Sequence, residues 1–191
     1  FKTGRKDMFV SHSTDMRHFD NTASFFTNNG SNFTKVSIPT ADVWSHGSDV
    51  GDLNNDGYLD IVMADLKSYN TTIALNNQVN GFTAYVDPLG NAGDARYGGS
   101  AVAIGNFMNN GGNNEIILTD AQCAVVSGTC SDSNTTKMYS VDFTGGVLTY
   151  THERDLPAFS TAGIDHSVEI ANHDFNEDGY ADVIVFSKKV N

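Results

Sequence analysis

The stretch Gly51–Asp60, with the sequence GDLNNDGYLD, decides how the rest of this chain is interpreted. Counted from Asp52, it has oxygen-bearing side chains at positions one, three, five and nine, and a glycine at position six. Calcium takes about six to eight oxygen ligands, and a glycine permits the sharp turn that gathers them. The stretch therefore predicts a calcium loop. Its expected ligands are the side chains of Asp52, Asn54, Asp56 and Asp60 and the backbone carbonyl of Tyr58.

A second stretch, His173–Asp182, repeats this pattern as HDFNEDGYAD. Both stretches run straight into a short apolar segment, IVMA after the first and VIVF after the second. Two such loops in one chain, each opening a strand, predict about two bound calcium ions. The expected ligands of the second loop are the side chains of Asp174, Asn176, Asp178 and Asp182 and the carbonyl of Tyr180.

The EF-hand is the obvious alternative, and the sequence excludes it on two counts. An EF-hand loop needs a bidentate Glu at position twelve, where this chain has Met63 and Val185. An EF-hand loop also leads into a helix, whereas Ile61–Ala64 and Val183–Phe186 are short, apolar and rich in β-branched residues. Both loops are therefore expected to precede buried strands.

The composition favours an all-β globular protein. The chain has 191 residues, enough for one domain with a core, and its eighteen glycines and three prolines predict many turns and little helix. The net charge of −12 argues against nucleic acid as a partner, because that role requires a basic surface. Solubility and calcium binding explain the acidity equally well. No apolar run is long enough to cross a membrane.

Short predicted strands follow one another in a constant order: strand, loop, buried strand, turn, strand, strand. Repeated units of four short antiparallel strands are typical of β-propeller blades. The predicted units contain about 3, 4, 4 and 2 strands, so two of them are complete four-stranded blades. A propeller needs roughly four to eight full blades to close. We therefore expect a segment of a larger propeller, completed by further blades or by neighbouring subunits. The predicted units are residues 1–40, 41–90, 91–158 and 159–191.

The third unit contains a degenerate copy of the loop, Asn106–Glu115. This copy has one extra residue, and Glu115 is its one carboxylate, where the intact loops have three Asp among the ligand positions. Because calcium affinity depends on the number of charged ligands, we expect this loop to be empty or weak.

Three segments carry a resemblance to a known family: SDVGDLNNDGYLDIVMA, GGSAVAIGNFMNNGGNNEIIL and HSVEIANHDFNEDGYADVIVF. They resemble the FG-GAP/VCBS repeats of integrin-α-like β-propellers. The resemblance implies blades of four-stranded antiparallel sheets, structural calcium in the loops between strands, and an extracellular or cell-surface location. The chain begins with Phe1 and not with Met, so we expect a processed form or an excised piece.

Two further features fit an extracellular protein. Cys123 and Cys130 enclose the residues AVVSGT and are expected to form a disulfide across a hairpin loop, with a pair of free thiols as the alternative. Four Asn-x-Ser/Thr sequons are weak indicators of glycosylation, because a chain rich in Asn and Thr contains some by chance. They begin at Asn29, Asn32, Asn70 and Asn134.

Catalytic motifs are missing from the sequence, which has no GxSxG, HExxH or CxxC motif. A repeated acidic loop fits a structural metal better than a catalytic one, since an active site is normally single. We therefore expect a calcium-binding module, not an enzyme, with a structural, adhesion or assembly role and protein or glycan partners. The alternatives are a glycan-binding lectin and an accessory domain of a polysaccharide-degrading enzyme.

Overall fold

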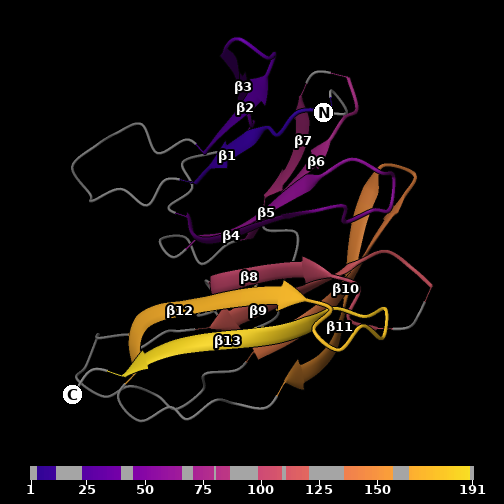
Figure 1. Ribbon diagram of the computed structural model, residues 1–191. Coiled ribbons are helices and arrows are strands. Elements are labelled where there is room, and N and C mark those ends of the chain that lie inside the picture. The colour runs from indigo at the N-terminus through magenta and orange to yellow at the C-terminus, as the bar shows by residue number, and fades with distance from the viewer. Residues whose placement is uncertain are drawn as a thin grey trace.

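The computed structural model describes residues 4–11, 23–39, 45–65, 71–79, 81–86, 99–108, 111–120, 136–156 and 164–189. Every regular element in these residues is a β-strand, which confirms the predicted all-β class (Figure 1). This part of the chain contains no helix long and apolar enough to span a membrane. The strands are β1 (Met8–Val10), β2 (Ser24–Asn28), β3 (Phe33–Ser37), β4 (Ser45–Gly51), β5 (Asp60–Asp65), β6 (Thr71–Asn76), β7 (Phe82–Val86), β8 (Gly99–Gly105), β9 (Glu115–Asp120), β10 (Thr136–Thr144), β11 (Val147–Leu156), β12 (Ile164–His173) and β13 (Asp182–Lys189).

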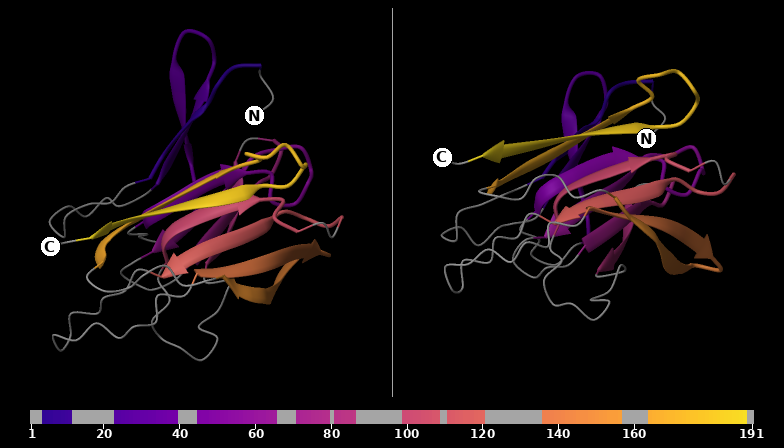
Figure 2. Two further views of the ribbon diagram at one scale, coloured as in Figure 1. Left: turned by 60° about the horizontal axis from the view of Figure 1, so that its bottom comes forward. Right: turned by 90° about the horizontal axis from the view of Figure 1, so that it is seen from below.

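These strands form four antiparallel sheets in which neighbours along the chain are neighbours in space. The first sheet contains β1–β3, the second β4–β7, the third β8–β11 and the fourth β12–β13. The strand counts of three, four, four and two are those that the sequence predicts. Each sheet is an up-and-down meander, and Figure 2 shows the twist of the sheets from two further sides. The predicted calcium loops connect β4 to β5 and β12 to β13.

Successive sheets pack face to face, with a hydrophobic core between each pair. The core between the first and second sheets includes Phe25, whose ring makes an edge contact with that of Phe82 at 5.1 Å between centroids. At the opposite end of the stack, the core between the third and fourth sheets includes Ile117, with Ile170 and Val183 packed against it. The strands that open the sheets also meet: β8 packs against β4 and against β12, and lies between them in Figure 1.

Strand β5 shows why the segment after the first loop is apolar without alternation. Ile61 and Met63 belong to the core shared with the first sheet, whereas Val62 belongs to the core shared with the third. Successive side chains of a strand point to opposite faces, so a sheet covered on both sides needs apolar residues at every position. All three side chains are accordingly 0% exposed.

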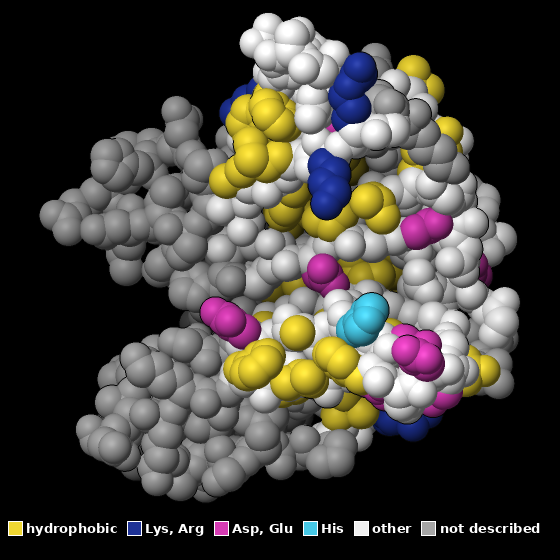
Figure 3. All heavy atoms as spheres, in the orientation of Figure 1, with side chains coloured by type: hydrophobic (Ala, Val, Ile, Leu, Met, Phe, Trp, Pro, Cys, Tyr) yellow, Lys and Arg dark blue, Asp and Glu magenta, His cyan; other side chains and the backbone are white. Residues whose placement is uncertain are grey.

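The fourth sheet is covered on one face among the described residues. Val183 packs against the third sheet, whereas Ile184 and Phe186 on β13 are 41% and 53% exposed, and Phe175 in the second loop is 53% exposed. Figure 3 shows hydrophobic side chains gathered over this part of the molecule. We call Phe175, Ile184 and Phe186 the outer apolar face.

The predicted modification sites divide between described and undescribed parts of the chain. Asn29 and Asn32 lie in the exposed turn between β2 and β3, where Asn29 Oδ1 accepts hydrogen bonds from the backbone N–H groups of Ser31 and Asn32. Asn70, Asn134 and the predicted Cys123–Cys130 disulfide lie outside the described residues.

Candidate metal centre

The loop between β4 and β5 has the backbone conformation that the sequence pattern requires. Asn55 at position four has φ 57°, and Gly57 at position six has φ 85°. Both values lie in the left-handed region, which glycine adopts freely and asparagine more readily than most other residues. These two residues turn the backbone around the side chains at positions one, three and five.

Short hydrogen bonds hold those side chains in place. Asp52 accepts from the backbone N–H groups of Asp56 and Gly57, at 3.0 and 2.8 Å. Asn54 Oδ1 accepts from the Asp56 N–H at 3.1 Å, and Asp56 Oδ1 accepts from the Tyr58 N–H at 2.8 Å. Each predicted ligand side chain at these three positions is thus fixed by the backbone of its own loop.

The loop between β12 and β13 repeats this arrangement bond for bond. Asp174 accepts from the N–H groups of Asp178 and Gly179 at 3.0 and 2.8 Å. Asn176 accepts from the Asp178 N–H and Asp178 from the Tyr180 N–H, both at 2.9 Å. The left-handed residues recur at the same positions, with φ 60° at Glu177 and φ 92° at Gly179. The repeated sequence pattern therefore specifies one loop geometry twice.

The carboxylate at position nine closes each loop onto its strand. Asp60 is 0% exposed; its Oδ2 accepts from the Leu53 N–H and its Oδ1 from the Asn76 N–H, both at 2.9 Å. Asp182 Oδ2 accepts from the Phe175 N–H, the equivalent donor, at 3.1 Å. Burial raises the pKa of Asp60 to about 6, the Asp56 and Asp52 carboxylates add to the rise, and the two N–H groups oppose it.

The donor set fits a hard cation. It consists of carboxylate, amide and carbonyl oxygens, which calcium and magnesium prefer, with no nitrogen or sulfur ligand. Among the described residues, no group of three His, Cys, Asp or Glu is arranged to hold a metal. The ligands predicted for the first loop also include the Asn54 side chain and the Tyr58 carbonyl, which are not of these residue types. Asp56 Oδ2 instead attracts two side-chain amides, Gln78 Nε2 at 2.9 Å and Asn54 Nδ2 at 3.2 Å. A cation at this oxygen would take the place of those donors.

In the degenerate loop, Glu115 performs the closing role of Asp60. It is 0% exposed, and its Oε2 accepts from the N–H groups of Phe107 and Met108 at 2.7 and 3.1 Å. The Glu side chain has one methylene more than Asp, which suits a loop that is one residue longer. The carboxylate retained at this position therefore has a structural role that does not need a metal.

The structure also reveals half of a fourth loop, Gly4–Asp7, which sequence reasoning missed. Gly4 has φ 72°, in the left-handed region like Gly57, and stands three residues before Asp7, which directly precedes β1, just as Gly57 stands three residues before Asp60. Asp7 Oδ1 accepts from the Asn28 N–H at 2.8 Å, as Asp60 accepts from Asn76. Asn28 Nδ2 in turn donates to the carbonyl of Lys6 at 3.2 Å, as Asn76 Nδ2 donates to that of Leu59 at 3.3 Å.

Two sequence signals could have revealed this half-loop. One is the GxxD spacing before an apolar strand. The other is the Asn-Asn pair at the end of the following strand, which occurs as TNNG at the end of β2 and as LNNQ at the end of β6.

Neighbouring loops contact one another along one edge of the stacked sheets. Asn114 Nδ2 donates to the Asp52 carbonyl at 2.6 Å, which joins the degenerate loop to the first loop. The Ala181 N–H donates to the Asn106 carbonyl at 2.8 Å, which joins the second loop to the degenerate loop. The loops are therefore coupled, and ordering of one restrains the next.

A half-buried carboxylate, Asp49, links three sheets beside these loops, and its contact to the fourth sheet is a long hydrogen bond of 3.4 Å from Asn172 Nδ2. Asp49 on β4 accepts from the Ile104 N–H of β8 at 2.7 Å, and Asn172 of β12 donates to the Ile104 carbonyl. Burial raises the pKa of Asp49 above its usual value of 3.8, although its hydrogen bonds lower it in part.

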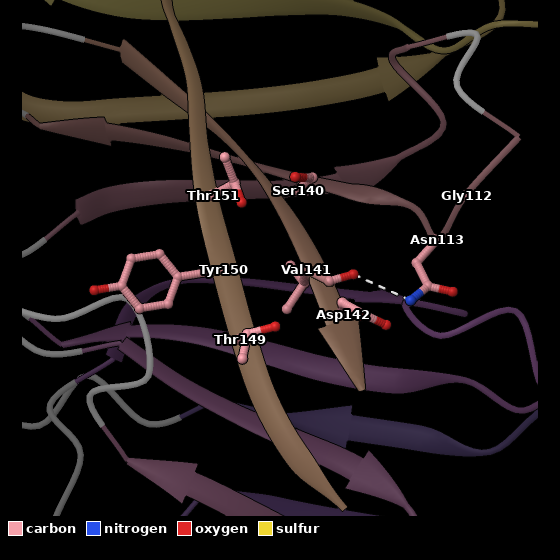
Figure 4. Close-up of a pocket in the computed structure, with 8 residues that line it drawn as sticks. All are labelled: Gly112, Asn113, Ser140, Val141, Asp142, Thr149, Tyr150 and Thr151. Carbon is pink, nitrogen blue, oxygen red and sulfur yellow. Dashed lines mark hydrogen bonds between the residues drawn. The ribbon is translucent and has the colours of Figure 1, made fainter. Parts of the chain in front are cut away.

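A polar hollow of about 300 Å³ lies on the β10–β11 hairpin (Figure 4). Ser140, Asp142 and the two threonines of β11 present short polar side chains there. The Tyr150 side chain points away from them in Figure 4 and packs on Tyr139, with 6.1 Å between ring centroids.

Comparison with protein families gives one match. The family described as FG-GAP-like repeat matches residues 2–63. The match confirms the resemblance predicted from the sequence, and it runs from the half-loop at Gly4–Asp7 through the first sheet to the first complete loop. No curated protein matches the chain. An FG-GAP-like repeat indicates a β-propeller-like protein–protein interaction module.

Proposed function

We propose that this chain is an extracellular calcium-binding β-propeller module with a structural, adhesion or assembly role. The observation that carries the proposal is the duplicated loop geometry. Five hydrogen bonds and two left-handed residues recur at equivalent positions in loops more than one hundred residues apart in sequence. The FG-GAP-like repeat at residues 2–63 supports the same interpretation.

Electrostatics supports calcium as a stabilising ion. Burial is the main cause of the raised pKa of Asp60, and repulsion from the Asp56 and Asp52 carboxylates of the same loop raises it further. A bound calcium ion would compensate this repulsion in both loops. Its proposed role is to stabilise the fold, because the same loop recurs along the chain and an active site is normally single.

The stacked sheets support a propeller whose remaining surface engages partners. Successive sheets pack through both faces and the opening strands β4, β8 and β12 lie together, as the blades of a propeller would. The outer apolar face includes two phenylalanines that are about half exposed. It groups three exposed hydrophobic residues on one sheet and its loop, whereas exposed hydrophobic residues are normally scattered singly over a protein surface. We propose that further blades or a neighbouring subunit cover it. Binding, rather than catalysis, is the proposed activity.

Thermal melting tests this proposal. We expect the midpoint to rise by several degrees from excess EDTA to millimolar calcium, because the ion binds the folded loops and not the unfolded chain. Asp56→Ala and Asp178→Ala should each reduce this shift. The exposed Asp142, which lies on β10 outside the loops, supplies the matched control, and Asp142→Ala should retain the full shift. An identical midpoint in both solutions would refute the calcium proposal.

A further inference from the structure

The end of the β8–β9 ladder lies beside both complete loops. Gly105 and Glu115 form the last pair of this ladder, and we call residues 104–106 and 114–116 the bridge. Strand β8 packs against both β4 and β12, and Figure 1 shows β8 and β12 side by side with their arrowheads on the same side of the molecule. The strands that lead into the two complete loops therefore both contact the strand that ends in the bridge.

The first loop and the strand before it contact the bridge in three ways. Asn114 Nδ2 donates to the backbone carbonyl of Asp52, the predicted ligand at position one, at 2.6 Å. Leu53, the next residue of the loop, is 0% exposed and belongs to the same core as Ile104. Asp49 Oδ2 on β4 accepts from the Ile104 N–H at 2.7 Å. The first loop in its closed form thus holds the bridge in place.

The second loop and the strand before it contact the bridge from the other side. The Ala181 N–H donates to the Asn106 carbonyl at 2.8 Å, and Ala181 lies between the predicted ligands at positions seven and nine. A Cβ added to Gly105 would lie 2.9 Å from the Cβ of Ala181, so the two backbones are in close contact. Asn172 Nδ2 on β12 donates to the Ile104 carbonyl. The second loop therefore holds the same few bridge residues as the first.

We propose that the bridge couples the two complete loops, so that filling either loop with calcium raises the calcium affinity of the other. This inference rests on the proposed calcium loops. The ends of strands open locally more readily than their interiors, and a loop held closed by its ion would keep the bridge closed. The second loop to be filled would then have less of the chain left to order, which gives positive coupling. The effect is reciprocal by linkage.

The geometry accounts for the sign of the coupling. The hydrogen bonds on both sides of the bridge exist together in one structure, in which both loops have the closed backbone conformation. Both loops therefore favour the same arrangement of the bridge. The coupling also gives the third sheet a role in calcium binding, although its own loop is the degenerate one.

Calcium isotherms of three proteins, measured by competition with a chromophoric chelator, test the coupling. Asp56→Ala and Asp178→Ala each keep one intact loop and give the two single-loop association constants, and the wild type gives the constants of the pair. We expect the product of the two wild-type constants to exceed the product of the single-loop constants by about fivefold or more, the lower end of usual allosteric couplings. A ratio of one with two ions bound would overturn the coupling alone, whereas a chain that binds no calcium would overturn the calcium proposal as well.

A change in the bridge gives the second arm of the test. Asn114→Ala, placed in each of the three proteins, removes the bond to the Asp52 carbonyl and should lower the ratio to about twofold or less. Asn113 supplies the matched control, because its Nδ2 donates to the Val141 carbonyl of the third sheet at 3.1 Å. Asn113→Ala should keep the full ratio. A ratio that Asn114→Ala leaves unchanged, or that both variants lower equally, would overturn the proposal.

Hydrogen exchange follows the coupling without any change in the bridge. In Asp178→Ala, calcium can fill the first loop only, while the Ala181 N–H in the second loop remains opposite the Asn106 carbonyl. Calcium should slow exchange of the Ala181 amide in this variant by about twofold or more, because the bridge is held closed. The Gly30 amide in the β2–β3 turn is the control and should exchange at an unchanged rate. Slowing confined to the first loop would overturn the proposal.

Discussion

Replacing the buried Glu115 gives a sharp test of how the degenerate loop is held together. Glu115→Ala removes the acceptor for two backbone donors, the N–H groups of Phe107 and Met108. A buried donor left unsatisfied costs about 1–3 kcal/mol, so for these two half-buried donors the expected loss in the free energy of unfolding is at most roughly 2–6 kcal/mol. Glu115→Gln keeps an acceptor oxygen but loses the charge, and should cost only about 1–2 kcal/mol.

Urea unfolding followed by tryptophan fluorescence and circular dichroism measures these losses. A loss of about 3 kcal/mol corresponds to a fall of roughly 6–12 °C in Tm for a chain of this size. Both losses should be the same in EDTA and in calcium, because the carboxylate binds backbone and not metal. Glu153→Ala, which removes an exposed glutamate bonded to Ser140, is the control and should change stability by less than about 0.5 kcal/mol. A calcium-dependent effect of Glu115→Ala would refute this account of the loop.

Three further outcomes are expected. Asp49→Asn should remove a pH dependence of stability. Because the pKa of Asp49 is raised in the folded state, the folded protein binds that proton more tightly than the unfolded chain does. The stability of the wild type relative to the variant should therefore fall as the pH rises above about 4 toward neutrality. A flat difference in urea midpoints between pH 4 and 7 would contradict this. Gly105→Val should lower the free energy of unfolding by about 1–3 kcal/mol, because a Cβ at Gly105 would lie 2.9 Å from the Cβ of Ala181. As a control, Gly145→Asn in the open β10–β11 turn should leave the stability nearly unchanged. Phe186→Asp should lower self-association in light scattering without lowering Tm, and Phe33→Asp, at a residue with 54% exposure, is its control.

Local patterns made the strands and loops predictable from sequence. The loop pattern after Asp52 specifies its own hydrogen bonds within six residues, and the apolar run Ile61–Ala64 marks a strand buried on both faces. Such features need no knowledge of the rest of the chain. For the same reason, the three, four, four and two strands follow from alternation and turn residues alone.

Contacts between sheets were not predictable, because they depend on where distant residues meet. Nothing local to Asn114 indicates that its amide will reach the Asp52 carbonyl, and nothing local to Asp49 indicates an acceptor for the Ile104 N–H. The half-loop at Gly4–Asp7 was missed for a different reason. The residues that precede it, FKT, do not carry the alternating acids by which the other loops were recognised.

The number of calcium ions bound per chain tests the central claim most directly. Equilibrium dialysis against calcium, with the bound metal measured by atomic absorption, should give about two ions for the wild-type chain. Asp56→Ala and Asp178→Ala should each give about one ion, and Asp142→Ala about two. No bound calcium at millimolar concentration, or a count unaffected by both loop substitutions, would contradict the account.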